Sequence, residues 1–240
     1  MALWVTKVYL SLPITKTDFK YYLFISNKKM NFISHLNEVK EFVKKMTFTY
    51  DESHDFNHAE AVATNAYEIC LHETPKEGPV GTINEDEICT VIFAAYVHDV
   101  CDSKYIDVNK GVDMIRKELK KYCTESECNN IIEIITNISY STEKKFGYPK
   151  LSSPRQQLLR DIVSDADKIE ALGEIGIMRC FAYERERSRD PSDEFIIRQN
   201  VIQHCKDKLL HLKDNYIRTQ YGKTMAEKHH QVIVDFVAKY

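Results

Sequence analysis

A histidine and an aspartate stand side by side at the end of a strongly apolar stretch of the chain. The apolar residues ahead of the pair recur at helical spacing: Ile88, Val91, Ile92, Phe93 and Ala95. This spacing predicts a buried helix that ends at His98 and Asp99. Burying an imidazole or a carboxylate costs free energy unless the group is paired or bound to a metal. The pair is therefore a candidate for half of a metal site.

Two other stretches place histidines or carboxylates in helices that are otherwise expected to be apolar. The first holds His54, Asp55 and His58 at the predicted start of a helix. The second holds Asp165 and Asp167 inside an apolar helix, where aspartate has a poor propensity. Helical geometry places these two aspartates about 200° apart, so they face different neighbours. Either stretch could supply the missing ligands.

Helical patterns continue over most of the chain after residue 30. The predicted helices cover approximately 31–46, 58–72, 84–99, 108–121, 124–138, 153–173, 173–188, 192–213 and 223–240. Capping signals mark three of the starts: Asn84 with Glu87, Thr124 with Glu127, and Ser153 before Pro154. The isoleucine-rich run at 131–138 is compatible with a strand, but its cap and length favour a helix. Gly173 is expected to end the helix that starts at Ser153.

Composition narrows the class of protein. With only 7 Gly and 6 Pro in 240 residues, the chain has few turn residues, and we predict an all-α single domain of about eight or nine helices. The net charge of −3 gives no electrostatic case for binding nucleic acid. Residues 1–30 lack helical periodicity and are expected to form an irregular or disordered extension, and residues 31–240 the domain.

The cysteines and the apolar stretches indicate where such a protein resides. Seven cysteines without a Cys-x-x-Cys pair are typical of a reduced, intracellular protein. The apolar first dozen residues lack the basic start of a signal peptide, and no stretch is long enough to span a membrane. We therefore expect a cytoplasmic protein without membrane contact.

The chain contains, in order, the H…HD…D pattern of the HD superfamily of metal-dependent phosphohydrolases. The residues that reproduce this pattern are His58, the His98-Asp99 pair and Asp167. The chain resembles the small single-domain HD proteins of the nucleotide pyrophosphohydrolase type. Five segments carry the resemblance: SHDFNHAEAV at 53–62, AAYVHDVCDSKY at 94–105, IIEIITNISYS at 131–141, VSDADKIEALGEIGIMRCFAY at 163–183 and HCKDKLLHL at 204–212. The resemblance covers most of residues 31–240 and implies a single HD-domain helical bundle.

The resemblance implies one divalent transition-metal ion bound by His58, His98, Asp99 and Asp167. Two imidazoles and two carboxylates suit Mn²⁺, the leading candidate, and also Fe²⁺, Co²⁺, Ni²⁺ or Zn²⁺. Four protein ligands on a six-coordinate ion leave two positions for water or a substrate oxygen. Such an ion lowers the pKa of bound water and polarises a phosphoryl oxygen.

Asp102 and Lys104, which follow the His-Asp pair in the chain, are candidates for catalysis. Asp102 lies one helical turn beyond His98 and is expected to act as a general base, and the related alarmone hydrolases have an acidic residue at the matching place. The alternative is a carboxylate at a helix end, exposed to solvent. Lys104 is expected to neutralise substrate phosphates and to stabilise their charge during the reaction, although a solvated surface charge is an equal alternative.

Substrate binding is also predicted for His54, Asp55 and Lys168. His54 precedes His58 by one turn and could contact a phosphate or orient a ligand. Lys168 stands beside Asp167 and could neutralise a phosphate, or it could be a surface charge. The chain departs from the family at Ala61, where an arginine often stands, and this leaves its substrate preference in doubt.

These features predict a divalent-metal phosphohydrolase that hydrolyses nucleotides, of the nucleoside triphosphate pyrophosphohydrolase type, by attack of metal-bound water. The expected partner is a small-molecule nucleotide, and a homo-oligomer is compatible with the sequence. A phosphomonoesterase or phosphodiesterase with the same site is the first alternative. A non-catalytic regulator that binds a metal and a nucleotide is the second, and a purely structural helical domain the last.

Overall fold

The computed structural model describes residues 27–73, 82–188 and 190–240. The chain divides into two compact units, Met1–Glu38 and Val39–Tyr240, which are taken separately. Helix α2 (Asn27–Met46) crosses the boundary between them. Most of the predicted N-terminal extension, residues 1–26, lies outside the described residues. Its last four positions belong to α2, which begins at Asn27, so they are helical and not irregular.

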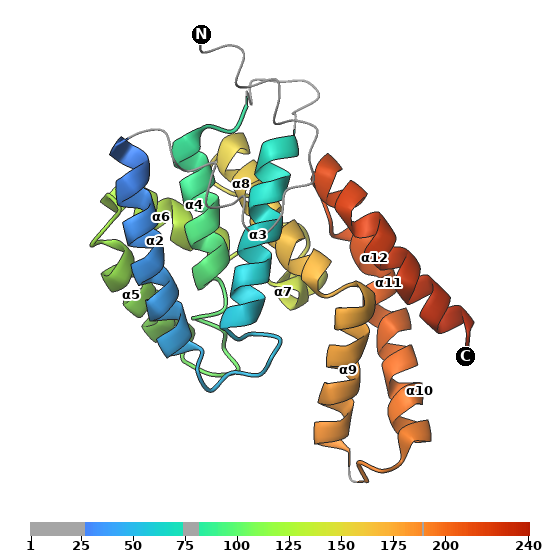
Figure 1. The fold of residues 1–240 in the computed structure, drawn as a ribbon. Coiled ribbons are helices and arrows are strands. Elements are labelled where there is room, and N and C mark those ends of the chain that lie inside the picture. Colours follow the sequence, from blue (N-terminus) through green and yellow to red (C-terminus); the bar gives the residue numbers. More distant parts are fainter. Residues whose placement is uncertain (1–26, 74–81, 189) are drawn as a thin grey trace. The chain divides into compact units, whose positions relative to one another are not determined.

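Every regular element in the described ranges is helical, which confirms the all-α prediction (Figure 1). After α2 the elements are α3 (Phe56–His72), α4 (Glu85–Val97), α5 (Val108–Leu119), α6 (Glu125–Ile135), α7 (Tyr140–Phe146), α8 (Pro154–Glu170), α9 (Gly173–Arg187), α10 (Glu194–His204), the π-helix η1 (Cys205–Leu209), α11 (Leu210–Asn215) and α12 (Gln220–Ala238). Of the helices described, none is both long and apolar enough to cross a membrane.

Side-chain caps explain where several helices begin. Asn84 and Thr124 each accept a hydrogen bond from a backbone N–H three residues later, and the glutamates there bond back to the cap backbone. Ser153 caps α8 with Pro154 at its first position. These three predicted starts are confirmed, because each cap supplies an acceptor for an N–H that has no partner within the helix.

Other boundaries differ from those predicted. Helix α8 ends at Glu170 and not at Gly173, because Gly173 already starts α9 and adopts a positive φ of 75°. The loop predicted before Ser153 contains the short helix α7, which Ser139 caps. The single helix predicted over 192–213 is interrupted by the π turn η1. The last helix starts at Gln220, three residues earlier than expected.

Helices α3, α4 and α8 pack against one another at the centre of the unit Val39–Tyr240, and α6 packs on α4 and α8. Alanines that are at most 2% exposed occur on all three central helices: Ala59, Ala63, Ala66, Ala94, Ala95 and Ala166. Small side chains let helix axes approach closely. Close packing brings the ends of these helices within reach of one another.

The ends that meet belong to different helices. His58 lies in the first turn of α3, His98 follows the last residue of α4, and Asp167 lies in the last turn of α8. The start of α3 therefore lies beside the ends of α4 and α8, so α3 runs in the opposite direction to both. The fold thus assembles the predicted ligands at one end of the central helices.

A buried aspartate joins α8 to α12. Asp165 is fully buried, and one of its carboxylate oxygens accepts hydrogen bonds of 2.7 Å from both the backbone N–H and the hydroxyl of Thr219, the N-cap of α12. The backbone N–H of Arg218 donates to the same carboxylate at 3.0 Å. A Cβ at Gly222 would lie 2.4 Å from the Thr219 hydroxyl, so this close approach requires glycine. Asp165 therefore faces away from Asp167, as the helical spacing predicts.

Candidate metal centre

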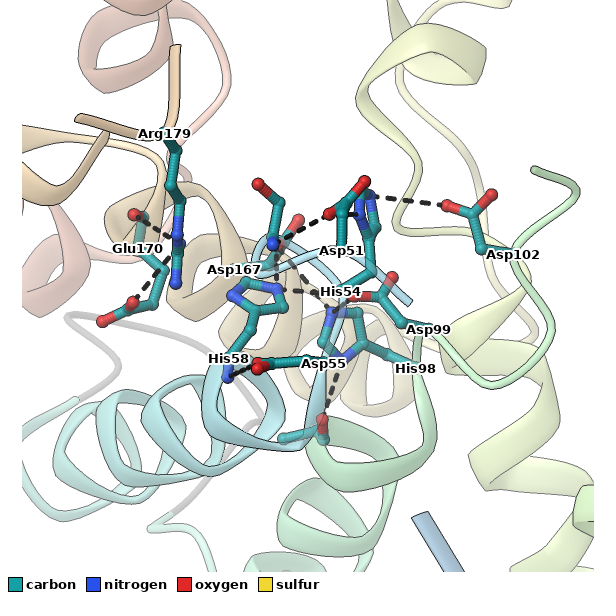
Figure 2. A network of polar contacts seen from close by, with 12 residues as sticks. Asp51, His54, Asp55, His58, His98, Asp99, Asp102, Asp167, Glu170 and Arg179 are labelled. Atoms are coloured by element: carbon teal, nitrogen blue, oxygen red, sulfur yellow. Dashed lines mark hydrogen bonds and ion pairs between the residues drawn. The ribbon is translucent and has the colours of Figure 1, made fainter. Parts of the chain in front are cut away.

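Four side chains converge where the three central helices meet (Figure 2). The Nε2 atom of His58 lies 3.5 Å from Asp99 Oδ2 and 3.3 Å from Asp167 Oδ1. The Nε2 atom of His98 lies 3.1 Å and 3.8 Å from the same two oxygens. Adjacent ligands of an octahedral ion with bonds of roughly 2.1 Å lie roughly 3 Å apart. These nitrogen-to-oxygen distances are therefore compatible with a first-row divalent ion at the cluster, and His58, His98 and Asp99 form its most compact part.

The orientation of His98 is fixed by its other ring nitrogen. Nδ1 lies 2.7 Å from the carbonyl oxygen of Ala95, and a carbonyl can only accept, so Nδ1 carries the hydrogen. This leaves Nε2 as the nitrogen that faces Asp99. A hydrogen bond to the second nitrogen is the usual way in which proteins orient a metal-binding imidazole.

Unsatisfied atoms at the centre of the cluster test whether a metal fits. Over the described part of the chain, the buried side-chain atoms without a hydrogen bond include His98 Nε2, Asp99 Oδ2 and His58 Nδ1. The first two point into the four-residue cluster, and the third lies on the opposite side of its ring from it. Leaving such atoms unpaired is costly. His58, His98 and Asp99 also each offer a ligand atom within 4.8 Å of the others, so the residues present fit a divalent ion.

Without a metal, the cluster holds its charges by mutual attraction. Burial alone favours a neutral imidazole, but the Asp99 and Asp167 carboxylates outweigh it and raise the pKa of His98 to about 9. Burial likewise opposes ionisation of Asp99 and Asp167, yet the histidines hold the pKa of both carboxyls below their usual values. In the metal-free protein a proton on His98 takes the place of positive charge that a metal ion would bring.

We expect metal binding to release this proton. Near neutral pH, Mn²⁺ should displace about one proton per ion, because a protonated nitrogen cannot bind a metal. The apparent affinity should fall about tenfold for each unit by which the pH is lowered below the pKa of His98. Calorimetric titrations in buffers of different ionisation enthalpy measure the released protons. His211→Ala, at an exposed position, should leave the number unchanged, and heats that are independent of the buffer would contradict the prediction.

A second polar layer lies beside the four ligands. The Nδ1 atom of His54 lies 2.7 Å from Asp51 Oδ1, and the hydroxyl of Tyr105 donates to the other Asp51 oxygen at 2.6 Å. The Nε2 atom of His54 lies 2.8 Å from the Lys104 ammonium and 3.8 Å from Asp102 Oδ2. Because Lys104 can only donate, His54 accepts through Nε2 and donates to Asp51 through Nδ1. The layer thus brings Asp102 and Lys104 together with His54, all three predicted from the sequence.

Asp51 is the member of this layer to which the sequence assigned no role. Partial burial favours its neutral form, but the hydrogen bonds from Tyr105 and His54 outweigh burial and lower the pKa of Asp51 to about 2. It stays ionised and holds the His54 ring in one tautomer. The sequence offered one signal, a carboxylate three residues before a histidine in a polar stretch. Only the turn at 51–54 brings the Asp51 carboxylate into contact with His54.

Asp55 and Lys168 have partners within the protein. Asp55 caps α3: one of its oxygens accepts from the backbone N–H of His58 at 2.9 Å and the other from Asn57 at 3.1 Å. Lys168 is only 2% exposed, and its ammonium bonds to the Ser164 hydroxyl and lies 3.9 Å from Glu143. Both residues support the ligands beside them in the chain. Their direct contact with substrate stays a prediction.

Glu143 lies at the centre of a buried ionic cluster behind the metal site. Its two oxygens accept from Arg160 at 2.8 Å and from Arg218 at 2.6 Å. Arg160, which is fully buried, also donates to the backbone carbonyl of Asn137 at 2.8 Å and to Asp161 at 3.0 Å. These bonds satisfy a guanidinium that would be costly to bury alone. The cluster adjoins Lys168, the residue after the predicted ligand Asp167.

Comparison with known proteins identifies the family. Residues 55–172 match the model of the HD domain family. The protein YpgQ of Bacillus subtilis (strain 168) is 27% identical over 211 residues, which cover 87% of this chain and 93% of YpgQ. Residues 55–172 therefore form an HD domain, which confirms the predicted resemblance to the HD superfamily.

Solved structures of similar fold agree with this assignment. The crystal structure of Bacillus subtilis YpgQ in complex with ADP superposes with a TM-score of 0.64 at 22% identity, over 88% of this chain and 95% of that one. An HD-superfamily hydrolase from Bacillus thuringiensis gives a TM-score of 0.63 at 26% identity, over 87% and 95% of the two chains. HD domains bind divalent metal, and the His58, His98 and Asp99 cluster lies within the matched residues.

Proposed function

We propose that the chain is a divalent-metal-dependent phosphohydrolase that cleaves a phosphoanhydride bond of nucleotides, in the manner of a nucleoside triphosphate pyrophosphohydrolase. The family and fold support a metal-dependent phosphohydrolase. The observation that carries the proposal is the convergence of two imidazole nitrogens and two carboxylate oxygens at the ends of α3, α4 and α8, where each Nε2 lies 3.1–3.8 Å from the Asp99 and Asp167 oxygens.

His58, His98, Asp99 and Asp167 would hold the ion, of which Mn²⁺ is the proposed identity. A divalent ion bound there supplies Lewis acidity toward a phosphoryl oxygen and lowers the pKa of a coordinated water. Asp167 is the most exposed ligand, with 32% of its side chain accessible, so substrate approaches from its side.

The second layer performs the proton and charge chemistry. Asp102, 22% exposed and next to His54, accepts a proton from the attacking water. Lys104 donates to His54 and, when substrate arrives, can turn its ammonium to a phosphate oxygen. Asp51 keeps His54 oriented during this exchange. The contacts of all three groups with His54 support these roles.

Nucleotides are proposed as substrates on two grounds. YpgQ, to which the chain is similar over most of its length, was crystallised with ADP. The stacked pair Tyr50 and Tyr105, with ring centroids 3.8 Å apart, adjoins His54 and offers an aromatic surface for a base.

A product analysis tests the proposal. Purified Mn²⁺-loaded protein is incubated with ribo- and deoxynucleoside mono-, di- and triphosphates, p-nitrophenyl phosphate and bis-p-nitrophenyl phosphate. Release of pyrophosphate from triphosphates is the expected result. Orthophosphate alone from monophosphates would favour a phosphomonoesterase, and cleavage of the diester a phosphodiesterase. Nucleotide binding without turnover of any compound would favour a regulator and refute the enzyme.

Replacing Asp102 separates catalysis from metal binding. We expect Asp102→Ala to retain the ion and lose about 100-fold in kcat, because a positioned general base contributes at least that factor. Elemental analysis and steady-state kinetics measure the two effects. Asp113→Ala, at an exposed position of α5, is the matched control and should behave as wild type. If Asp102→Ala keeps full turnover, Asp102 is not the general base.

A further inference from the structure

A lysine that belongs to neither layer of the site is within electrostatic range of the predicted ligand Asp167. Lys208 projects from the π turn η1, in a segment far along the chain from the ligands. Asp167 acts on it electrostatically more strongly than any other carboxylate, and Lys104 and Lys144 are also within electrostatic range. Lys208 is therefore within electrostatic range of Asp167, and the segment just before α7 reaches the same region, because the ammonium of Lys168, the residue after Asp167, donates to the Ile138 carbonyl at 3.5 Å.

The Lys208 ammonium is held in place without a carboxylate partner. It lies 5.0 Å from the centroid of the Tyr140 ring, and the Lys144 ammonium lies 5.8 Å from the same centroid. Tyr140 is itself fixed by Tyr216, with ring centroids 4.8 Å apart. In the part of the chain that the structure describes, neither lysine forms an ion pair. Two ammonium groups beside one aromatic ring repel each other, and an anion that contacts both would offset this repulsion.

The surroundings of Lys208 work against its positive charge. Burial lowers the pKa of Lys208, and the neighbouring Lys104 and Lys144 lower it further, whereas Asp167 raises it. A divalent ion would offset the charges of Asp99 and Asp167, and Asp167 would then attract Lys208 less strongly.

The backbone at Lys208 is unusual in the same place. The N–H of Leu210 donates to the carbonyl of Cys205, five residues earlier, which defines the π turn. The turn separates α10 from α11, and Cys205 and Leu209 remain buried within it. Such turns are rare and cluster at functional sites. Here the turn carries Lys208 to the ring of Tyr140.

We propose that Lys208 and Lys144, over the face of Tyr140, form an anion subsite that binds the phosphates of the substrate next to the one under attack. The identity of this anion as substrate rests on the proposed phosphohydrolase function. The subsite favours compounds with two or more linked phosphates, because a single phosphate at the metal centre does not also reach it. It thus selects nucleoside di- and triphosphates over monophosphates.

Binding of inorganic pyrophosphate tests the subsite without relying on turnover. Pyrophosphate and orthophosphate are titrated calorimetrically into the full chain with Mn²⁺ in excess. Lys208→Met keeps the length of the side chain and removes its charge, and we expect it to weaken pyrophosphate binding about 10- to 100-fold. Orthophosphate binding should change less than threefold. Lys144→Gln, at an exposed position, should weaken pyrophosphate binding about threefold.

Two further variants separate the site from folding and from overall charge. Lys206→Met removes an exposed charge from the same π turn and should leave pyrophosphate binding unchanged. Lys208→Arg should retain most of the binding, and elemental analysis should find the ion in every variant. The proposal is overturned if Lys208→Met binds pyrophosphate as wild type does, if Lys206→Met weakens it equally, or if wild type binds no pyrophosphate.

Kinetic measurements distinguish failure of the anion subsite from failure of the proposed phosphohydrolase function. Lys208→Met should raise the KM for triphosphates with little change toward p-nitrophenyl phosphate. Pyrophosphate binding that depends on Lys208, without turnover of any substrate, would uphold the subsite and refute the phosphohydrolase. Turnover of triphosphates that is unchanged by Lys208→Met would uphold the phosphohydrolase and refute the subsite.

Discussion

Asp99→Ala is expected to yield a folded protein that cannot retain its ion and has no measurable hydrolase activity. Asp99 Oδ2 lies 3.1 Å from His98 Nε2 and 3.5 Å from His58 Nε2, so its removal takes away one of the two carboxylates that both imidazoles face. Loss of a supporting residue around a metal already costs about 10- to 100-fold in affinity, and loss of a ligand should cost at least about 100-fold. Mn²⁺ titration and elemental analysis measure the change.

Folding should survive this replacement because His98 can give up its proton. The pKa of His98 is raised by Asp99, and without that carboxylate burial favours the neutral imidazole. Circular dichroism should therefore show helical content close to wild type. Asp102→Ala provides the contrast, since it should lose turnover and keep the ion. If Asp99→Ala binds Mn²⁺ with unchanged affinity, the assignment of the metal centre to this position is wrong.

Glu143→Ala should lower the free energy of unfolding of the metal-free protein by about 3–5 kcal/mol. The side chains of Arg160 and Lys168 are 0% and 2% exposed, and Glu143 is the carboxylate that lies close to both. Removing it leaves buried positive charge without sufficient compensation. Urea denaturation followed by circular dichroism measures the loss, and Glu143→Gln, which keeps the side-chain oxygen as an acceptor, should fall between wild type and alanine.

An exposed ion pair supplies the matched control. Glu194 bonds to Arg185 at 3.0 Å, but both side chains are about half exposed. Glu194→Ala should change the free energy of unfolding by at most about 1 kcal/mol. Equal losses for the two variants would mean that the Glu143 cluster does not stabilise the fold through its burial.

Local chemistry explains which parts of the fold could be predicted. The starts of α4, α6 and α8 follow from Asn84, Thr124 and Ser153, because a cap and its hydrogen bonds lie within four residues of each other. The π turn at Cys205–Leu209 has no comparable local signal. It depends on packing among segments that are distant in the sequence, which single-residue preferences do not register.

In the candidate site, too, some features could be predicted from the sequence and others depend on tertiary contacts. The spacing of Asp165 and Asp167 predicts different neighbours for the two acids, and the structure gives Asp165 to the start of α12. That partner lies more than fifty residues further along the chain and could not be read from α8. Asp51 escaped assignment because a turn, and not a helix, brings it to His54. Residue types predict the chemistry, whereas tertiary contacts decide which groups take part.

The four predicted ligands lie in α3, in the two positions after α4 and in α8, which are far apart in the sequence, so no short segment could form the metal centre by itself. Uptake of an ion by these residues would then follow the docking of α3, α4 and α8, and the ion would bind the folded chain in preference to the unfolded one. At a free ion concentration one hundred times the Kd, this linkage adds about 2.7 kcal/mol to the free energy of unfolding. The supply of the metal would therefore control how long each copy of the protein survives proteolysis in the cell, as well as how fast it works.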